Sequence, residues 1–190
     1  MRESSVTLAG TCLGLTAHKY GHGVGALDGW RFCPRCAGAL EPADGGLRCT
    51  ACGFATWANS APGAQALVER DGRVLLGRRG LDPSAGLWDI PGGFLDEGED
   101  PLDALRRELR EETGLEIEPL ELLGMWTQDY AGRSVLCLTW LARPTGGEER
   151  AGDDLVELRW FAPDELPSPE ELAFDTFVEI LELWRARERL

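Results

Sequence analysis

Residues 92–115 constrain the fold most, because they combine a helix start, a helix stop and a dense group of acidic side chains. Asp100-Pro101 is a favourable helix start, with a side-chain acceptor at the cap and proline in the first turn. Gly114 is a matching helix stop. The segment therefore predicts a helix near residues 101–113. Three leucines form the face that packs inward: Leu102, Leu105 and Leu109.

Three glutamates converge on one face of this predicted helix. At about 100° per residue, Glu108, Glu111 and Glu112 fall within roughly a third of the helix circumference. Such a cluster raises its own pKa values, so it gains nothing without a compensating cation. Mg²⁺ prefers oxygen ligands and binds through carboxylates, waters and substrate phosphates. We therefore predict a divalent-metal site, which Gly92 and Gly93 let the backbone approach closely.

Glu99 lies just before the helix, where it can fold back on Arg107 and fix the preceding loop. The alternative is a charged surface helix without a function. That alternative explains a Glu-Glu pair but not the whole pattern of residues 92–115.

The six cysteines are unevenly placed, with Cys12 and Cys137 isolated from the others. The other four form two Cys-x-x-Cys pairs: Cys33, Cys36, Cys49 and Cys52. Two such turns facing each other supply the four ligands of a structural zinc ion, which takes no part in chemistry. A hairpin turning at residues 44–46 fits between the pairs. The arrangement resembles a zinc ribbon over residues 31–56. Redox-active pairs are disfavoured because neither pair follows a strand-helix unit.

Charge and hydropathy limit the partners. The 190 residues carry 33 acidic and 19 basic side chains, a net charge of -14. This surface repels phosphate backbones, which disfavours nucleic acid as a partner. No apolar run reaches the roughly 18 residues needed to cross a bilayer. Residues 6–17 differ from a signal peptide, because no net positive stretch precedes them. We expect a cytoplasmic protein that has no membrane partner.

The chain divides into four regions, the third of which is a short linker. Residues 1–30 are expected to be loosely structured, since glycines flank the helix-spaced pair His18 and His22. The zinc ribbon follows, then a linker at 57–63, with the main domain spanning 60–190. Five strands are expected in that domain: 64–69, 73–78, 116–127, 133–143 and 155–161. A polar loop is expected at 144–153, and a packing helix with an apolar stripe at about 169–189. This order predicts an α+β sandwich with helices on a mixed sheet.

A 23-residue pattern resembles the signature of Nudix hydrolases at every defined position. Its members are Gly93, Glu99, Arg107-Glu108-Leu109, Glu111-Glu112 and Gly114-Leu115. The resemblance implies an α/β/α sandwich that hydrolyses the pyrophosphate bond of nucleoside diphosphates linked to another moiety. It also implies Mg²⁺ or Mn²⁺ held by Glu108, Glu111, Glu112 and the backbone carbonyl of Gly92. Arg107 and Glu99 complete the implied catalytic set.

The substrate is suggested by the ribbon and by one loop. A four-cysteine ribbon ahead of a Nudix domain resembles the subgroup acting on NADH, FAD or ADP-ribose. The chain lacks the Ser-Gln-Pro-Trp-Pro-Phe-Pro type segment of NADH-hydrolysing members, so NADH is disfavoured. Residues 78–88 instead look like small ribbon-bearing relatives assigned to ADP-ribose and FAD. Arg78 and Arg79 are candidate phosphate ligands. Trp88, Tyr130 and Trp126 are candidate ring contacts, although Trp88 is more often a core residue in such a position.

The implied mechanism is attack of a metal-activated water on one phosphorus, which releases two monophosphates. Glu111, Glu112 or a loop acid would take the proton, and Asp153, Asp154 and Glu157 are candidates for a further metal-reaching acid. One alternative is a nucleotide-sensing module whose ribbon contacts a partner or nucleic acid. The complete glutamate set and the ribbon's few arginines disfavour it. Another is a Nudix-like isomerase of isoprenoid diphosphates, for which Cys137 is a weak candidate. The sequence leaves the oligomeric state undecided, with a homodimer as one possibility.

Overall fold

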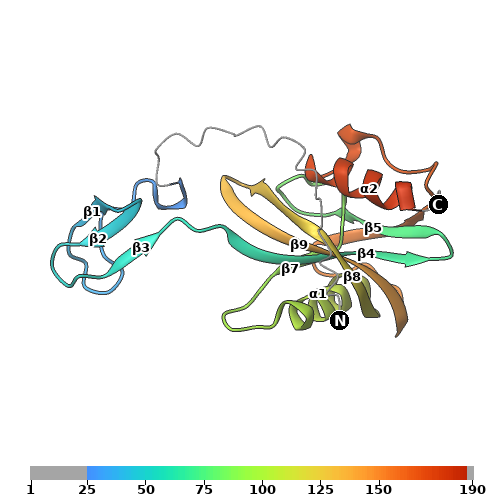
Figure 1. The fold of residues 1–190 in the computed structure, drawn as a ribbon, viewed down its shortest axis with the longest axis horizontal. Helices are drawn as coiled ribbons and strands as arrows, with labels where there is room; N and C mark the ends of the chain where they lie inside the picture. Colours follow the sequence, from blue (N-terminus) through green and yellow to red (C-terminus); the bar gives the residue numbers. More distant parts are fainter. Residues whose placement is uncertain (1–24, 188–190) are drawn as a thin grey trace, which may run out of the picture.

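The structure, a computed structural model, describes residues 25–187. These residues form a three-stranded sheet, a seven-stranded sheet and two α-helices (Figure 1). Among them, no helix combines the length and the apolar character needed to cross a membrane. The expectations for residues 6–17 and for His18 and His22 lie outside the described residues.

The small sheet lies at one end of the molecule (Figure 1) and consists of β1 (Leu40–Ala43), β2 (Gly46–Cys49) and β3 (Ala55–Trp57). The chain turns between β1 and β2 at Asp44 and Gly45, which both have positive φ. Gly46 is required next to this turn, because a Cβ there would lie 2.2 Å from the carbonyl oxygen of Thr56. A short 3-10 helix, η1 (Gly25–Leu27), precedes this sheet in the chain.

The large sheet has the strand order β10-β5-β4-β9-β8, with β6 paired to β5 and β7 paired to β4. Its strands are β4 (Ala61–Arg70), β5 (Arg73–Arg79), β6 (Trp88–Asp89), β7 (Gly92–Phe94), β8 (Leu115–Tyr130), β9 (Arg133–Gly147) and β10 (Leu155–Phe161). β4 pairs with β9 in parallel and the other pairs are antiparallel, so the predicted mixed sheet is confirmed. Asp71 and Gly72 form the predicted turn between β4 and β5.

The two helices cover opposite faces of this sheet (Figure 1), which gives the predicted α/β/α sandwich. α1 (Pro101–Thr113) buries Leu105 and Leu109 against Ala64 and Ala66 of β4. α2 (Thr176–Arg187) packs in a second cluster with Leu67 of the same strand. Neighbouring residues of β4 thus face different helices, because side chains alternate across a strand.

Three predicted boundaries are wrong, each because of a long-range pairing. The expected linker at 57–63 belongs partly to β3 and β4, since Ala61 already pairs with Val135 of β9. The expected loop at 144–153 begins inside β9, which continues to pair with β8 up to Gly147. The last helix begins at Thr176 rather than near 169. Before it lie the 3-10 helix η2 (Pro169–Glu171) and an extended Leu172 that bridges to Trp88 of β6.

Candidate active site

A cavity of about 310 Å³ lies between α1 and the large sheet's strands. Its walls come from β4, β6, β7, β8, β9, α1 and the loop before β10, so distant parts of the sequence meet there. Six carboxylates line it: Asp89, Asp96, Glu108, Glu112, Asp153 and Asp154. So many negative charges around one cavity are costly unless cations balance them.

Glu112 is the most buried of the acidic side chains on α1. Its residue is only 5% exposed, and its Oε2 accepts a hydrogen bond of 2.8 Å from the backbone N–H of Gly92. Burial raises the pKa of Glu112 well above its ordinary value, and the charges of Asp89 and Glu108 add to this rise. A buried carboxylate facing other carboxylates fits the donor set that Mg²⁺ or Mn²⁺ would take.

Glu108 lies against Gly93, one helical turn from Glu112. A Cβ on residue 93 would sit 2.4 Å from the carboxyl carbon of Glu108, so only glycine leaves room for that carboxylate. Burial raises the pKa of Glu108, while the neighbouring Arg107 guanidinium, 2.7 Å away, opposes the rise. The predicted role of Gly93 in allowing close approach therefore has a steric reason.

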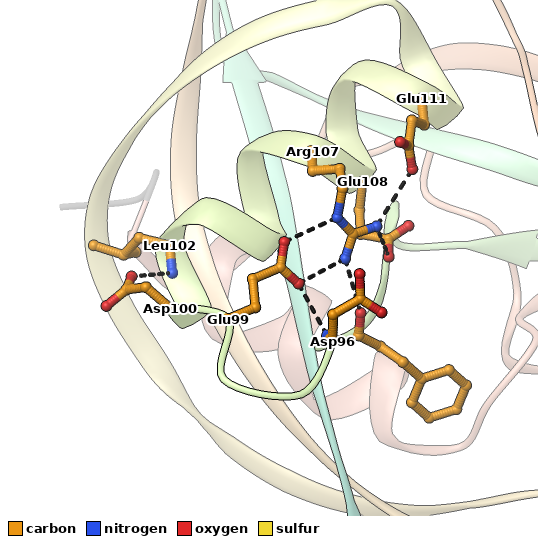
Figure 2. Close-up of polar contacts among 8 residues, drawn as sticks. Asp96, Glu99, Asp100, Leu102, Arg107, Glu108 and Glu111 are labelled. Atoms are coloured by element: carbon orange, nitrogen blue, oxygen red, sulfur yellow. Dashed lines mark hydrogen bonds and ion pairs between the residues drawn. The ribbon is translucent and has the colours of Figure 1, made fainter.

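Arg107 holds the loop before α1 in place (Figure 2). Its Nε and Nη2 donate to the two carboxylate oxygens of Glu99 at 2.9 and 2.8 Å, which is the pairing that the sequence predicts. Nη2 also donates to the carbonyl of Phe94, and the backbone N–H of Asp96 donates to Glu99. The hydrogen bonds from Arg107 lower the pKa of Glu99 to about 2. This network closes the loop over residues 94–99.

Glu111 lies apart from the other two glutamates of the predicted metal site. Its side chain is 50% exposed, does not line the cavity, and accepts a 3.3 Å bond from Arg107 (Figure 2). The structure thus brings Glu108, Glu112 and Gly92 together and leaves Glu111 on the solvent side of Arg107.

The predicted substrate-binding residues divide into two pairs. Arg79 and Tyr130 line the cavity, whereas Arg78 and Trp88 do not. Arg78 forms an ion pair with Glu157 and lies over the indole of Trp88. Trp88 is 4% exposed and contacts Phe161 edge-on in the core. Arg78 and Glu157 thus pair with each other near the surface and Trp88 is buried in the core, so none of the three lines the cavity.

Trp126, the third ring candidate, is only partly buried and packs against the core cluster that α2 completes. It does not line the cavity either. Of the aromatic side chains named as ring contacts, the structure therefore places only Tyr130 there.

Arg79 is bound by the protein itself rather than left free for substrate phosphate. Its guanidinium forms a buried ion pair with Asp89 and also donates to Pro83, Tyr130 and Asp154. The sequence prediction missed Asp89, although an acidic residue within the apolar stretch 87–90 was a usable signal. Burial raises the pKa of Asp89 to about 6, with Arg79 acting in the opposite direction.

The four predicted zinc ligands lie together: Cys33 and Cys36 precede β1, Cys49 ends β2, and Cys52 lies in the turn between β2 and β3. Their ligand atoms all fall within 4.8 Å of one another, and the sulfur pairs Cys33–Cys52 and Cys36–Cys49 are 3.6 Å apart. A disulfide would be about 2.05 Å long. Four sulfurs around zinc at about 2.3 Å are roughly 3.8 Å apart, so the cluster fits a zinc ion. This fit agrees with the predicted ribbon.

Comparison with known proteins identifies the family. Residues 60–180 match the NUDIX domain, which covers more than half of the chain. The protein therefore belongs to the Nudix family and is a Nudix hydrolase.

Two relatives and one solved structure illustrate its place in the family. An ADP-ribose pyrophosphatase of Methanocaldococcus jannaschii is 34% identical over 64% of this chain and 72% of its own. The NAD-capped RNA hydrolase NudC of Haemophilus influenzae is 29% identical over 84% of this chain, which spans just under two thirds (63%) of that relative. A crystal structure of a NUDIX hydrolase from Nitrosomonas europaea shares the fold, with a TM-score of 0.73 at 23% identity, over 84% of this chain and 93% of that one.

Proposed function

We propose that this protein hydrolyses the pyrophosphate bond of a nucleoside diphosphate-linked substrate, with ADP-ribose or FAD favoured over NADH. The observation that carries the proposal is the buried Glu112, fixed on the Gly92 amide within a cavity of six carboxylates. The name of the Methanocaldococcus relative supports ADP-ribose. Water adds to one phosphorus, the bridging oxygen leaves with the other phosphorus, and two monophosphates result.

The proposed divalent-metal site comprises Glu108, Glu112 and the backbone carbonyl of Gly92, with Glu111 at its solvent side. A bound Mg²⁺ or Mn²⁺ would stabilise charge on the phosphoryl oxygens and lower the pKa of water. Arg107 positions Glu108 through a 2.7 Å bond and holds the adjoining loop through Glu99. Asp153 and Asp154 line the cavity from another element, so they are the loop acids best placed to accept the proton.

The alternative functions have less support from the site. A sensing module needs no cluster of buried carboxylates, which is costly to maintain without a bound cation. An isomerase that relies on Cys137 would need a reactive thiolate. Burial raises the pKa of Cys137 to about 12, with Asp89 adding to the rise, so this thiol stays neutral at physiological pH.

NADH is included among the substrates to be assayed, because the match to the NudC relative extends beyond the NUDIX domain toward the cysteine cluster. The experiment incubates the protein with ADP-ribose, FAD, NADH, diadenosine polyphosphates or nucleoside triphosphates, with Mg²⁺, Mn²⁺ or a chelator, and identifies the products. We expect AMP to be released from ADP-ribose or FAD only with the cation. Preferred hydrolysis of nucleoside triphosphates, or activity unaffected by chelation, would contradict the proposal.

A matched pair of variants connects the activity to the cavity. Glu108→Gln removes a charge inside it, while Glu157→Gln removes an exposed charge that pairs with Arg78 outside it. We expect the first variant to lose most of its activity and the second to keep it. Equal activities would place the chemistry elsewhere.

A further inference from the structure

We infer that Gln128, oriented by Thr176, determines which ring the substrate can carry. The inference rests on the proposed function and concerns the part of the cavity that would bind the uncharged ring of the substrate. The ring that it fits is a planar nitrogen heterocycle with a hydrogen-bond acceptor on its edge.

Both glutamines of the chain, Gln65 and Gln128, line the cavity, and each is bonded to a threonine hydroxyl. The amide nitrogen of Gln65 donates to Thr139 at 2.9 Å in a buried pair. Gln128 has the opposite orientation, because its Oε1 accepts a 2.9 Å bond from the hydroxyl of Thr176. Within residues 25–187, its amide nitrogen has no hydrogen-bond partner. That N–H₂ group is therefore available to a ligand.

The wall around Gln128 is largely uncharged. Gln128 and Tyr130 lie on one face of β8, and Gln128 is paired in register with Val135 of β9. Val135 and Cys137 are both buried and line the same cavity. The carboxylates come from α1, β6 and loops, whereas Gln128, Val135 and Cys137 come from β8 and β9, so the uncharged lining that suits a ring lies on these two strands.

The segment 172–176, which ends at the first residue of α2, holds this uncharged part of the wall in place. Its backbone is anchored twice at Ala173, through an N–H bond to the Trp88 carbonyl and a carbonyl bond from the hydroxyl of Ser84. From the same segment, Phe174 contacts the ring of Tyr130 at 5.9 Å and Thr176 fixes Gln128. A polar group that is already oriented loses less entropy when a ligand binds, which favours discrimination.

The test measures binding of monophosphates in the presence of Mg²⁺, so it does not depend on turnover. AMP, NMN and FMN carry a planar nitrogen heterocycle, which is the ring meant here, and ribose 5-phosphate carries only its sugar. Gln128→Met keeps the length of the side chain but removes the donor. We expect it to reduce the affinity for one ligand, the ring-bearing monophosphate that wild type binds most tightly, by about 3- to 10-fold. Binding of ribose 5-phosphate should not change. Thr127→Val, on the exposed opposite face of β8, is the control and should leave all four affinities unchanged.

A double-mutant cycle separates positioning from general structure. In the wild-type background, Thr176→Val should weaken the binding of the same monophosphate, whereas Thr176→Ser should bind it as the wild type does. In the Gln128→Met background, Thr176→Val should cause no further loss of affinity. Three results would overturn the inference: wild type binding no ring-bearing monophosphate more tightly than ribose 5-phosphate, equal losses for all four ligands, or additive effects of the two substitutions. Absence of hydrolysis with these binding results intact would contradict the proposed function alone.

Discussion

Glu112 combines deep burial with a surrounding of like charges, and this sets the expected result of removing its charge. Glu112→Gln keeps the shape and should lower turnover on the order of 100-fold or more, because a charge that would hold the cation is lost. Without divalent cations, the variant should melt at the same or a higher temperature. In the wild type, the folded-state pKa of Glu112 is raised, so its ionised carboxylate lowers the stability of the folded protein at neutral pH.

Glu111→Gln is the matched comparison for this substitution, since Glu111 is half exposed and lies outside the cavity. It should reduce turnover less than Glu112→Gln. Kinetics and thermal melting in chelator check both variants, and near-normal turnover of Glu112→Gln would contradict the assignment.

Gly93 allows a steric prediction at the same site. In Gly93→Ala the new Cβ would meet the carboxylate of Glu108 at 2.4–2.6 Å, and the rigid sheet leaves that side chain to move. A misplacement of about 1 Å can reduce the rate on the order of 100-fold, which is the loss we expect. Gly146→Ala is the control, because a Cβ there meets no atom within 4 Å. Steady-state rates that are equal in the two variants would show that Glu108 needs no such room.

Individual residues of the site were predictable where chemistry is local to one element. The spacing on α1 placed Glu108 and Glu112, and the pairing of Glu99 with Arg107 followed from their positions beside the helix. Asp89 and Gln128 were missed, because their roles depend on strands that meet only in the folded sheet. Arg78 and Trp88 were proposed as ligands from residue type and from the likeness of the loop 78–88 to relatives, and packing directs both away from the cavity. The core position that the sequence favoured for Trp88 is confirmed.

At the scale of elements, the loop before α1 depends on the partly buried ion pair of Glu99 with Arg107. The pKa of Glu99 falls from 4.5 to about 2 in the folded protein. A carboxylate with a lowered folded-state pKa contributes stability above its unfolded pKa and loses it as the pH falls toward the folded value. The stability difference between wild type and Glu99→Gln should therefore shrink as the pH drops below about 4.5.

Denaturant unfolding between pH 7 and pH 3 measures this difference, with the substitution Glu97→Gln of an exposed neighbour outside the ion pair as the control. Arg107→Ala should lower both stability and rate, because it frees Glu99 and the loop. A stability difference that is constant with pH would contradict the role of the Glu99 pairing.

Elements with local signals were predicted well. The α1 boundaries agree with its caps, since Asp100 accepts from Leu102 and Gly114 has φ of 71°. The turn at Asp71-Gly72 fixed the hairpin of β4 and β5. The start of α2 was placed too early, because the apolar pattern continues through the non-helical residues 172–174, of which Leu172 bridges to Trp88 of β6. β6 and β7 are too short to have a period of their own.

At the scale of the whole molecule, we expect the small sheet to depend on metal rather than on a hydrophobic core. Few large apolar side chains support it: Leu47 is buried, whereas Trp57 of the sheet and the preceding Trp30 and Phe32 are exposed. Bound zinc would supply the missing stability. We expect about one tightly bound zinc per chain, and Cys49→Ser should remove it. Stability should fall first, and catalysis only as a consequence.

Elemental analysis with thermal melting measures both effects, and Cys137→Ala serves as the control because Cys137 lies in the cavity, outside the four-cysteine cluster. A well-folded, zinc-free wild type with normal melting would rule out a structural site. The cluster was predictable from spacing alone, whereas the parallel pairing of β4 with β9 joins segments about 70 residues apart and left no local signal.

The cavity is proposed to direct water to one phosphorus of a pyrophosphate. Hydrolysis of ADP-ribose in H₂¹⁸O with Mg²⁺, followed by mass spectrometry of the products, tests this proposal. We expect AMP and ribose 5-phosphate, with one ¹⁸O atom incorporated per cleavage and found in only one of the two products. Unchanged ADP-ribose, or cleavage at the glycosidic bond with an intact pyrophosphate, would contradict it.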